Sequence, residues 1–412
     1  MPQCRFCQTE LGDIVLDLGT SPLANAYILP ENTMRGEVYY PLRLWLCHSC
    51  GLAQLEEFVA PANIFSDYDY FSSYSESWLA HSKQYAERMI VERDLSARSQ
   101  VIEIASNDGY LLQYFVQSGI PVLGVEPAFN VAEVARSRGI PTESVFFGLQ
   151  AARRLRDAGD FADLLIGNNV LAHVPDINDF VAGLSCILKP DGLLTLEFPH
   201  LLKLVEGRQF DTIYHEHFSY FSLAAVSRIL EAHGLRIAKT EELPVHGGSL
   251  RLFVRHAGKG DGEADPVTGD ILRREASALL AEPGGYVGLA EDAKAIKLGL
   301  LEFLVEARRE GERVAAYGAA AKGNTLLNYA GVKQDLVSMV ADRNPAKQGK
   351  LLPGSRIPIV SPERLLEEKP ERVLILPWNL REEIIRQLDV VYSWGGEFVT
   401  AIPRLSFGKE VL

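Results

Sequence analysis

Positive charge is scarce in this chain of 412 residues, in which 41 Lys and Arg stand against 54 Asp and Glu and give a formal net charge of −13. No basic tract offers the potential that a nucleic acid or an anionic lipid surface requires, so we expect neither as a partner. No apolar run approaches the roughly 20 residues of a membrane span. The opening MPQCRFCQTE lacks the charged and then apolar plan of a secretion signal. These absences predict a cytoplasmic protein, and the length predicts two or three domains.

Cysteine is also scarce, with five residues, and in the cytoplasm these should be reduced. Four of them form two CxxC pairs, CRFC and CHSC, which can place four thiolates around one structural Zn²⁺. The alternatives are small buried thiols or a redox dithiol, and His48 inside the second pair could replace one thiolate. Cys186 stands alone in a helical pattern and is expected to pack as a small hydrophobic side chain. The predicted zinc ligands are Cys4, Cys7, Cys47 and Cys50.

The glycine-rich fingerprint G-x-G-x-x-G is missing, which disfavours NAD as a cofactor. In SQVIEIASNDGYLLQYF, residues 101–104 instead predict a buried parallel strand, and apolar residues take helical spacing after Gly109. A second strand, VLGVEPA, ends on Glu126, where a carboxylate can accept two ribose hydroxyls. Glu103 and the loop of small residues after it suit a ligand with an ammonium and a ribose but no pyrophosphate. A strand turn in some other α/β sheet is the alternative.

Strand and helix patterns alternate through the rest of the chain. ADLLIGNN and DGLLTLEFP flank a helix over 177–188, and GLRIAKTEEL and SLRLFVRH, after a helix over 223–233, predict a closing antiparallel pair in a doubly wound sheet. From about residue 311 a second, smaller Rossmann-like sheet is expected. There a helix start after Gly318, with Lys322, could meet a phosphate. Two amphipathic helices around EPGGY are expected to connect the two sheets.

Histidine is rare, with nine residues, yet two of them flank a glutamate in IYHEHFSYF at 213–221. Histidine is the natural base near neutral pH, so this cluster could remove a proton. A metal site, or the polar edge of a packed strand, would also explain it. His173, in NNVLAHV, would by itself more often be a satisfied loop residue.

The loop IEIASNDG resembles the first motif of class I S-adenosylmethionine-dependent methyltransferases, E/D-x-G-x-G-x-G, although Ala105 and Asn107 replace two of its glycines. The order of all the motifs resembles the nucleotide-sugar C-methyltransferases that build branched deoxysugars. These motifs are the four-cysteine module, FSDYDYFSSYSESWLAHS, IEIASNDGYLL, GNNVLAHV, IYHEHFSYFS, HGGSLR and YGAAAKGNTLLN. The resemblance covers essentially the whole chain. It implies a zinc domain at 1–65, a methyltransferase domain at 66–260, and a connector with a C-terminal nucleotide-sugar domain at 261–412.

The resemblance further implies that S-adenosylmethionine methylates the ring carbon beside the 4-keto group of a nucleotide-linked 6-deoxysugar, most often C3, and we expect a monomer. His217 would take the proton in an active site shared with Tyr214, Glu216, His173 and Tyr68, although periodicity cannot choose between Tyr68 and Tyr70. The expected cofactor-binding residues are Glu103, Ala105, Ser106, Asn107, Asp108, Glu126, Pro127, Asn168 and Asn169. The expected substrate-binding residues are Tyr70, Ser249, Arg251, Lys322 and Asn324. An O- or N-methyltransferase, and a non-catalytic nucleotide-sugar-binding or nucleic-acid-binding protein, are the rival interpretations.

Overall fold

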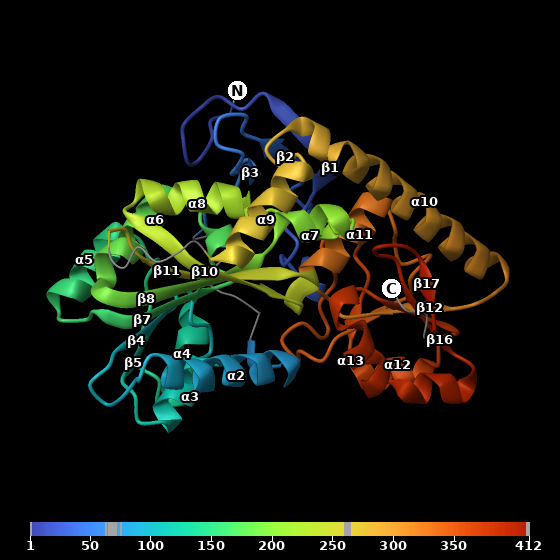
Figure 1. The fold of residues 1–412 in the computed structure, drawn as a ribbon. Coiled ribbons are helices and arrows are strands. Elements are labelled where there is room, and N and C mark those ends of the chain that lie inside the picture. Colours follow the sequence, from blue (N-terminus) through green and yellow to red (C-terminus); the bar gives the residue numbers. More distant parts are fainter. Residues whose placement is uncertain (1, 62–63, 65–71, 75, 259–264, 409–412) are drawn as a thin grey trace.

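The computed structural model describes residues 2–61, 64, 72–74, 76–258 and 265–408, which build three β-sheets. In Figure 1 the small N-terminal sheet lies above the central sheet, and the C-terminal sheet lies beside it. The long helix α10 (Val287–Arg309) runs from the N-terminal sheet to the C-terminal sheet. The expected α/β architecture of a zinc-binding module and two Rossmann-like sheets is therefore confirmed.

The central sheet has seven strands in the order β10-β11-β8-β7-β4-β5-β6. Neighbours are parallel from β6 to β8, whereas β11 is antiparallel to both β8 and β10. The predicted closing pair thus forms, with its second strand inserted between the first and the rest of the sheet. The bounds are β4 Val101–Ile104, β5 Val122–Val125, β6 Thr142–Glu143, β7 Ala162–Asn168, β8 Leu188–Pro199, β10 Leu235–Leu243 and β11 Ser249–His256.

Helices cover both faces of the central sheet because side chains of successive strand residues point to opposite faces. In β4, Val101 packs into the core on one face and Ile102 into the core on the other. The first face carries α2 (Glu76–Glu92), α3 (Leu112–Gln117) and α4 (Phe129–Ser137). The second carries α5 (Leu149–Asp157), α6 (Ile177–Ile187) and α8 (Leu223–Ala232) (Figure 1).

The N-terminal sheet has the order β1-β2-β3-β9, with β1 Asp13–Ser21, β2 Tyr40–Leu46, β3 Ala53–Gln54 and β9 Ser219–Tyr220. Its last strand therefore comes from the segment IYHEHFSYF, far along the chain. Directly after β9, the Ser222 hydroxyl accepts a hydrogen bond from the Ala225 N–H at 3.1 Å and caps α8. The histidine segment is thus fixed between a zinc-domain strand and a helix of the central domain.

The C-terminal sheet has the order β14-β13-β12-β15-β16-β17 and is parallel except for its last pair. Its strands are β12 Val314–Tyr317, β13 Val340–Ala341, β14 Ile359–Val360, β15 Arg372–Ile375, β16 Glu397–Thr400 and β17 Ser406–Phe407. The remaining helices are α7 Leu201–Glu206, α9 Pro266–Ser277, α11 Ala321–Ala330, α12 Pro362–Glu368 and α13 Arg381–Gln387. One hydrophobic core joins β2, α10, α11 and β15. The N-terminal and C-terminal parts are therefore packed against each other.

Short 3₁₀ helices occupy several of the connections. They are η1 Pro30–Asn32, η2 Ser72–Tyr74, η3 Leu171–His173, η4 Phe210–Thr212, η5 Val245–Gly247, η6 Pro283–Tyr286, η7 Trp378–Leu380 and η8 Asp389–Trp394. Of the predicted connector helices, α10 begins at Val287, directly after η6, which holds the EPGGY turn.

Candidate active site

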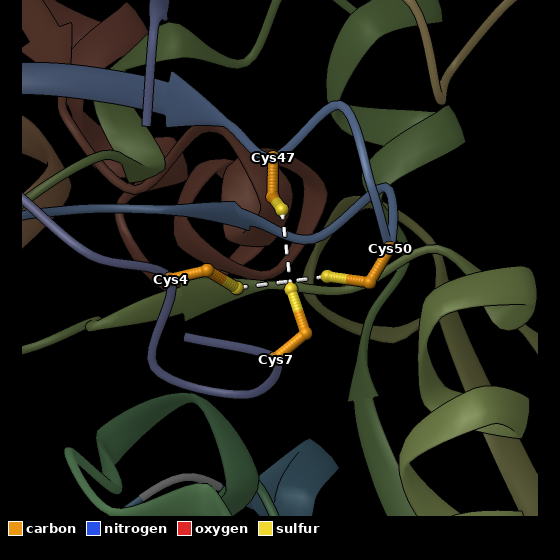
Figure 2. Close-up of side chains that lie close together, drawn as sticks. All are labelled: Cys4, Cys7, Cys47 and Cys50. Atoms are coloured by element: carbon orange, nitrogen blue, oxygen red, sulfur yellow. Dashed lines mark hydrogen bonds between the residues drawn. The ribbon is translucent and has the colours of Figure 1, made fainter. Parts of the chain in front are cut away.

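The four cysteines of the two CxxC pairs lie together. The Sγ atoms of Cys4 and Cys50 are 3.6 Å apart, those of Cys7 and Cys47 are 3.5 Å apart, and all four lie within 4.8 Å of one another (Figure 2). A tetrahedral site with Zn–S bonds of about 2.3 Å needs sulfurs about 3.8 Å apart, so the cluster fits structural Zn²⁺. The exposed His48 is not part of this group. The predicted zinc site is confirmed.

The loop after β4 adopts backbone conformations that glycine usually occupies. Ala105 has φ 57° and Asn107 has φ 50°, both in the left-handed region. The Asn107 N–H donates to Oε2 of Glu126 at 3.0 Å, and the Ala128 N–H donates to Oε1 at 2.9 Å. Pro127 lies between Glu126 and Ala128 in the chain. Loop and second strand therefore meet closely, and the Ser106 Oγ is only 2.4 Å from the place where a Cβ on Gly124 would stand.

Three acidic side chains are buried at this edge of the sheet. Burial raises the pKa of Glu126 to about 7 and raises the pKa of Glu103 well above its usual range, and the charge of Asp108 adds to both effects. Arg138 offsets part of this charge through an ion pair of 3.1 Å with Asp108. A cationic ligand would offset the remaining negative charge, and S-adenosylmethionine carries both a sulfonium and an ammonium. Ser106 Oγ and Asn168 Oδ1 are buried and have no hydrogen-bond partner in the described part of the chain. These residues fit that cofactor.

The end of β7 contributes the two asparagines that the sequence singled out. Asn168 is the last residue of the strand, and Asn169 takes φ 52° and donates its N–H to the carbonyl oxygen of Glu197 at 2.7 Å. Two residues on, η3 begins and carries His173. The turn thus links the expected cofactor residues to the histidine cluster.

His217 is held as a neutral imidazole, and both of its ring nitrogens have hydrogen-bond partners. Its Nδ1 lies 3.2 Å from the carbonyl oxygen of Thr212, which can only accept, so Nδ1 carries the proton. Its Nε2 therefore has the lone pair and accepts from the Tyr214 hydroxyl at 2.9 Å. Burial, followed by the nearby His173, lowers the pKa of His217 well below its usual range. The residue as a whole is nevertheless not fully buried.

His173 packs edge-on against His217, with ring centroids 4.7 Å apart, and its Nδ1 lies 2.8 Å from the carbonyl oxygen of Glu216. Burial lowers the pKa of His173 to about 4. The other two members of the motif face the zinc domain: Asn25 donates to Glu216 Oε1, and His215 Nε2 lies 3.1 Å from the Pro41 carbonyl oxygen. Within the described residues, the four cysteines are the group of metal ligands found, so the metal interpretation of HEH gains no support.

The C-terminal domain brings Lys322 to this region. Its Nζ donates to Asn379 Oδ1 at 2.7 Å and lies 4.8 Å from the Trp378 ring centroid. Trp378 Nε1 in turn donates to Oδ2 of the buried Asp211 at 2.9 Å, across to the central domain. Burial lowers the pKa of Lys322, an effect that Asp211 opposes. Two residues on, both amide atoms of the buried Asn324 side chain lack a partner among the residues the structure describes. A cation and an unsatisfied amide therefore lie at the interface of the two domains.

Arg251 and Ser249 differ from this pair because Arg251 Nη2 and the Ser249 hydroxyl already have hydrogen-bond partners, although Arg251 Nε has none among the described residues. Arg251 Nη2 donates to Glu197 Oε2 at 2.5 Å and lies 2.9 Å from His81 Nε2. The Ser249 hydroxyl donates to the Val245 carbonyl oxygen at 3.1 Å, within its own loop. The structure does not bring either side chain into contact with Lys322, and Tyr68 and Tyr70 lie outside the described residues.

Sequence reasoning missed His246 and its neighbours. His246 has φ 56° and its ring lies tilted against Trp78, with ring centroids 5.0 Å apart. Its Nε2 is buried with no partner in the described ranges. Burial, followed by the charge of Lys322, lowers its pKa to about 4. The two glycines after it in HGGS were the available signal, since such a turn can hold a side chain in a strained conformation. Asn25, Asp211 and Glu197 carried no local signal.

The strand order of the central sheet, its inserted antiparallel strand and the acidic loop at the strand ends define a class I S-adenosylmethionine-dependent methyltransferase. Three family models match in agreement with this: a zinc binding domain over residues 4–65, a methyltransferase domain over 79–240 and a C-methyltransferase C-terminal domain over 244–403. The chain is 36% identical over 401 residues to the C-methyltransferase NovU of Streptomyces niveus. These residues are 97% of this chain and 95% of that protein. It belongs to this family of S-adenosylmethionine-dependent C-methyltransferases.

Other similarities are shorter. A ubiquinone biosynthesis O-methyltransferase of Bartonella bacilliformis is 28% identical over 96 residues, which are 23% of this chain and 39% of that protein. The magnesium protoporphyrin IX methyltransferase of Synechocystis is 16% identical with a TM-score of 0.35, over 43% of this chain and 83% of that one. Neither likeness bears on the substrate. None of the described helices has the length and apolar character that crossing a bilayer requires.

Proposed function

We propose that this C-methyltransferase acts on a nucleotide-linked 4-keto-deoxysugar and transfers the methyl group to the ring carbon beside the ketone, at C3. The observation that carries the proposal is the tautomer of His217: its Nδ1 is committed to the Thr212 carbonyl oxygen, which leaves a lone pair on Nε2. Carbon needs such a base, because it becomes a nucleophile only when the neighbouring ketone lets it lose a proton. Transfer to an existing oxygen or nitrogen lone pair would need no enolisation.

In the proposed reaction, Nε2 of His217 takes the proton from the carbon beside the ketone, and the electron pair of that C–H bond moves into the enolate. Bound S-adenosylmethionine supplies an electrophilic methyl group. The enolate carbon forms the new C–C bond as the S–CH₃ bond breaks, and the sulfur keeps that electron pair as a thioether. The Tyr214 hydroxyl, which donates to Nε2 at 2.9 Å in the free protein, positions the imidazole and turns away when Nε2 takes the proton. A neutral imidazole suits this role because it needs no prior deprotonation.

We assign the nucleotide part of the substrate to the interface with the C-terminal domain. Lys322 and Asn324 lie at the start of α11, where backbone N–H groups and a cation can meet a diphosphate. The unpartnered amide of Asn324 supports a ligand contact there. Arg251, which is paired with Glu197 on the neighbouring strand β8, is better suited to holding β11 and β8 together than to contacting phosphate.

Hydrogen exchange at the substrate tests the proposed role of His217. A 4-keto nucleotide sugar incubated in heavy water with the enzyme and S-adenosylhomocysteine should gain deuterium at the carbon that is methylated. The variant His217→Asn should lose this exchange, keep cofactor affinity, and lower turnover by about 10²- to 10⁴-fold, which is the usual contribution of a positioned base.

His233→Asn is the matched control. His233 follows the last residue of α8, and its Nε2 lies 3.0 Å from Asn178 Oδ1, away from the histidine motif, which precedes α8 in the chain. It should exchange and methylate at the wild-type rate. Normal exchange by the His217 variant would transfer the role to another group. Methylation by the wild type only at oxygen or nitrogen would overturn the enolisation mechanism and the proposed substrate position together.

A further inference from the structure

The zinc domain contacts the histidine segment through its backbone. β3 pairs with β9 through Ala53 opposite Tyr220 and Gln54 opposite Ser219, and the Leu55 N–H donates to the Phe218 carbonyl oxygen at 3.0 Å. The segment from 213 to 218 forms no helix or strand of its own. Its path therefore depends on neighbouring elements, and β3 is one of them.

Gln54 links this strand pair to the zinc ligands. Its Nε2 lies 3.3 Å from Cys4 Sγ, and its Oε1 accepts from the Arg5 N–H at 2.9 Å. The second CxxC turn is equally close, because the Cys47 N–H donates to the Leu52 carbonyl oxygen at 3.0 Å, one residue before β3. The metal site thus fixes the strand against which β9 pairs.

Asn25 makes a second contact, directly to the side chain of Glu216. Its backbone N–H and its Nδ2 both donate to Glu216 Oε1, at 3.1 and 3.3 Å. The Tyr27 hydroxyl lies 3.2 Å from Asn25 Oδ1 and 2.7 Å from the Ala319 carbonyl oxygen of the C-terminal domain. Asn25 therefore lies where the three domains meet, and the Tyr27 hydroxyl orients its side-chain amide.

Glu216 is buried, with an exposed fraction of 1%, and it connects the zinc domain to the two histidines. Its side chain accepts from Asn25, whereas its backbone carbonyl oxygen lies 2.8 Å from His173 Nδ1, and His217 is the next residue. A shift of Glu216 would therefore move both imidazoles. Small displacements of this kind can lower turnover by about 10²-fold.

We propose that Asn25 is a positioning residue of the methyl-transfer site, and that the zinc domain holds the segment 213–221 in its reactive geometry through Asn25 and β3. The inference rests on the proposed role of His217. It gives the metal site a function in turnover beyond the stability of the N-terminal domain.

The variant Asn25→Leu tests this directly, because it removes the Nδ2 donor and keeps a side chain of similar size. We expect full zinc content and unchanged S-adenosylhomocysteine affinity by calorimetry, with turnover lowered by about 10- to 100-fold. Asn32→Leu, on η1 of the same domain, should retain wild-type turnover.

The pH profile of turnover separates positioning from general destabilisation. Burial raises the pKa of Glu216, and the Asn25 donors oppose that rise. Glu216 interacts electrostatically with two ionisable groups, Tyr27 and Tyr220. In addition, Lys347 Nζ lies over the Tyr27 ring, and His173 Nδ1 contacts the backbone carbonyl oxygen of Glu216. Loss of one donor should move the acidic limb of the profile to higher pH. An Asn25→Leu enzyme with the wild-type rate and profile, alongside an inactive His217→Asn enzyme, would overturn the proposal and leave the proposed function intact.

Metal removal from the wild-type protein provides a measurement that does not depend on a variant folding. After zinc is removed with a chelator, amide hydrogen exchange should become faster in residues 213–221. Residues 101–108 should keep their protection from exchange, and the protein should still bind S-adenosylhomocysteine. Unchanged protection of 213–221 would contradict the proposal. Loss of cofactor binding at the same time would also contradict it, since the metal would then support the whole molecule.

Discussion

At the scale of single residues, Ala105 and Asn107 show that a loop can follow a glycine path without glycine. Both residues have positive φ, which costs an alanine about 1 kcal/mol or more and an asparagine less. The contact between the Asn107 N–H and the Glu126 carboxylate accompanies this conformation. The departure from the usual motif therefore changes the residue types and leaves the backbone geometry in place.

Glu126 should give S-adenosylmethionine binding a dependence on pH. Burial raises the pKa of Glu126 to about 7, so the carboxyl group is largely neutral below that pH and ionised above it. An ionised carboxylate is the better acceptor for ribose hydroxyls, so affinity should fall as the pH is lowered through about 7. Glu126→Gln should weaken binding by about 1–3 kcal/mol at pH 8 and flatten this dependence.

Calorimetry at pH 6 and pH 8 would measure both effects. Glu143→Gln is a suitable control, because Glu143 ends the neighbouring strand β6 with an exposed side chain. Equal affinities for the wild type and the Glu126 variant at pH 8 would show that the ribose is bound elsewhere.

At the scale of elements, the unit of β4, loop and α3 depends on one glycine more than on the others. Gly109 has φ 79°, and a Cβ added there would lie 2.2 Å from Ile140 Cδ1, which is buried. Gly119, after α3, has φ 71° and nothing within 4 Å of an added Cβ. The two positions therefore share the backbone strain of a substitution and differ in the space available.

Gly109→Ala and Gly119→Ala should accordingly differ in stability. Both variants incur about 1–2 kcal/mol for a left-handed alanine. Gly109→Ala should lose about 1–3 kcal/mol more, because its methyl group overpacks the core at Ile140. Urea unfolding of both proteins gives the comparison, and equal losses would show that Ile140 can move aside without cost.

At the scale of the whole molecule, the three sheets are joined by a shared strand segment and a shared hydrophobic core. The N-terminal sheet takes β9 from the middle of the chain, and one hydrophobic core runs from β2 through α10 and α11 to β15. A change at the zinc ligands should therefore be felt beyond the first 65 residues.

Replacement of Cys47 by Ser should abolish stoichiometric zinc and lower the thermal midpoint, because metal binding at a closed thiolate site contributes directly to folding. Cys186→Ser is the control, since Cys186 lies in α6, outside the metal site. Zinc content by atomic emission and thermal unfolding would measure the two effects. A Cys47→Ser protein that retains one zinc per chain would contradict the four-thiolate site.

CxxC spacing, apolar periodicity and strand-end acids are local signals, so the sequence by itself determined the zinc ligands, the main strands and helices of the central sheet and the presence of a second sheet after about residue 311. The order of the motifs indicated the family. Tertiary structure alone decided what surrounds the histidine motif. Asn25, Asp211 and Trp378 come from separate segments with no spacing that relates them, yet they contact Glu216 or meet one another at the domain interface. The neutral state of His217 likewise depends on burial and on a carbonyl oxygen five residues away, which only the folded chain brings to its Nδ1.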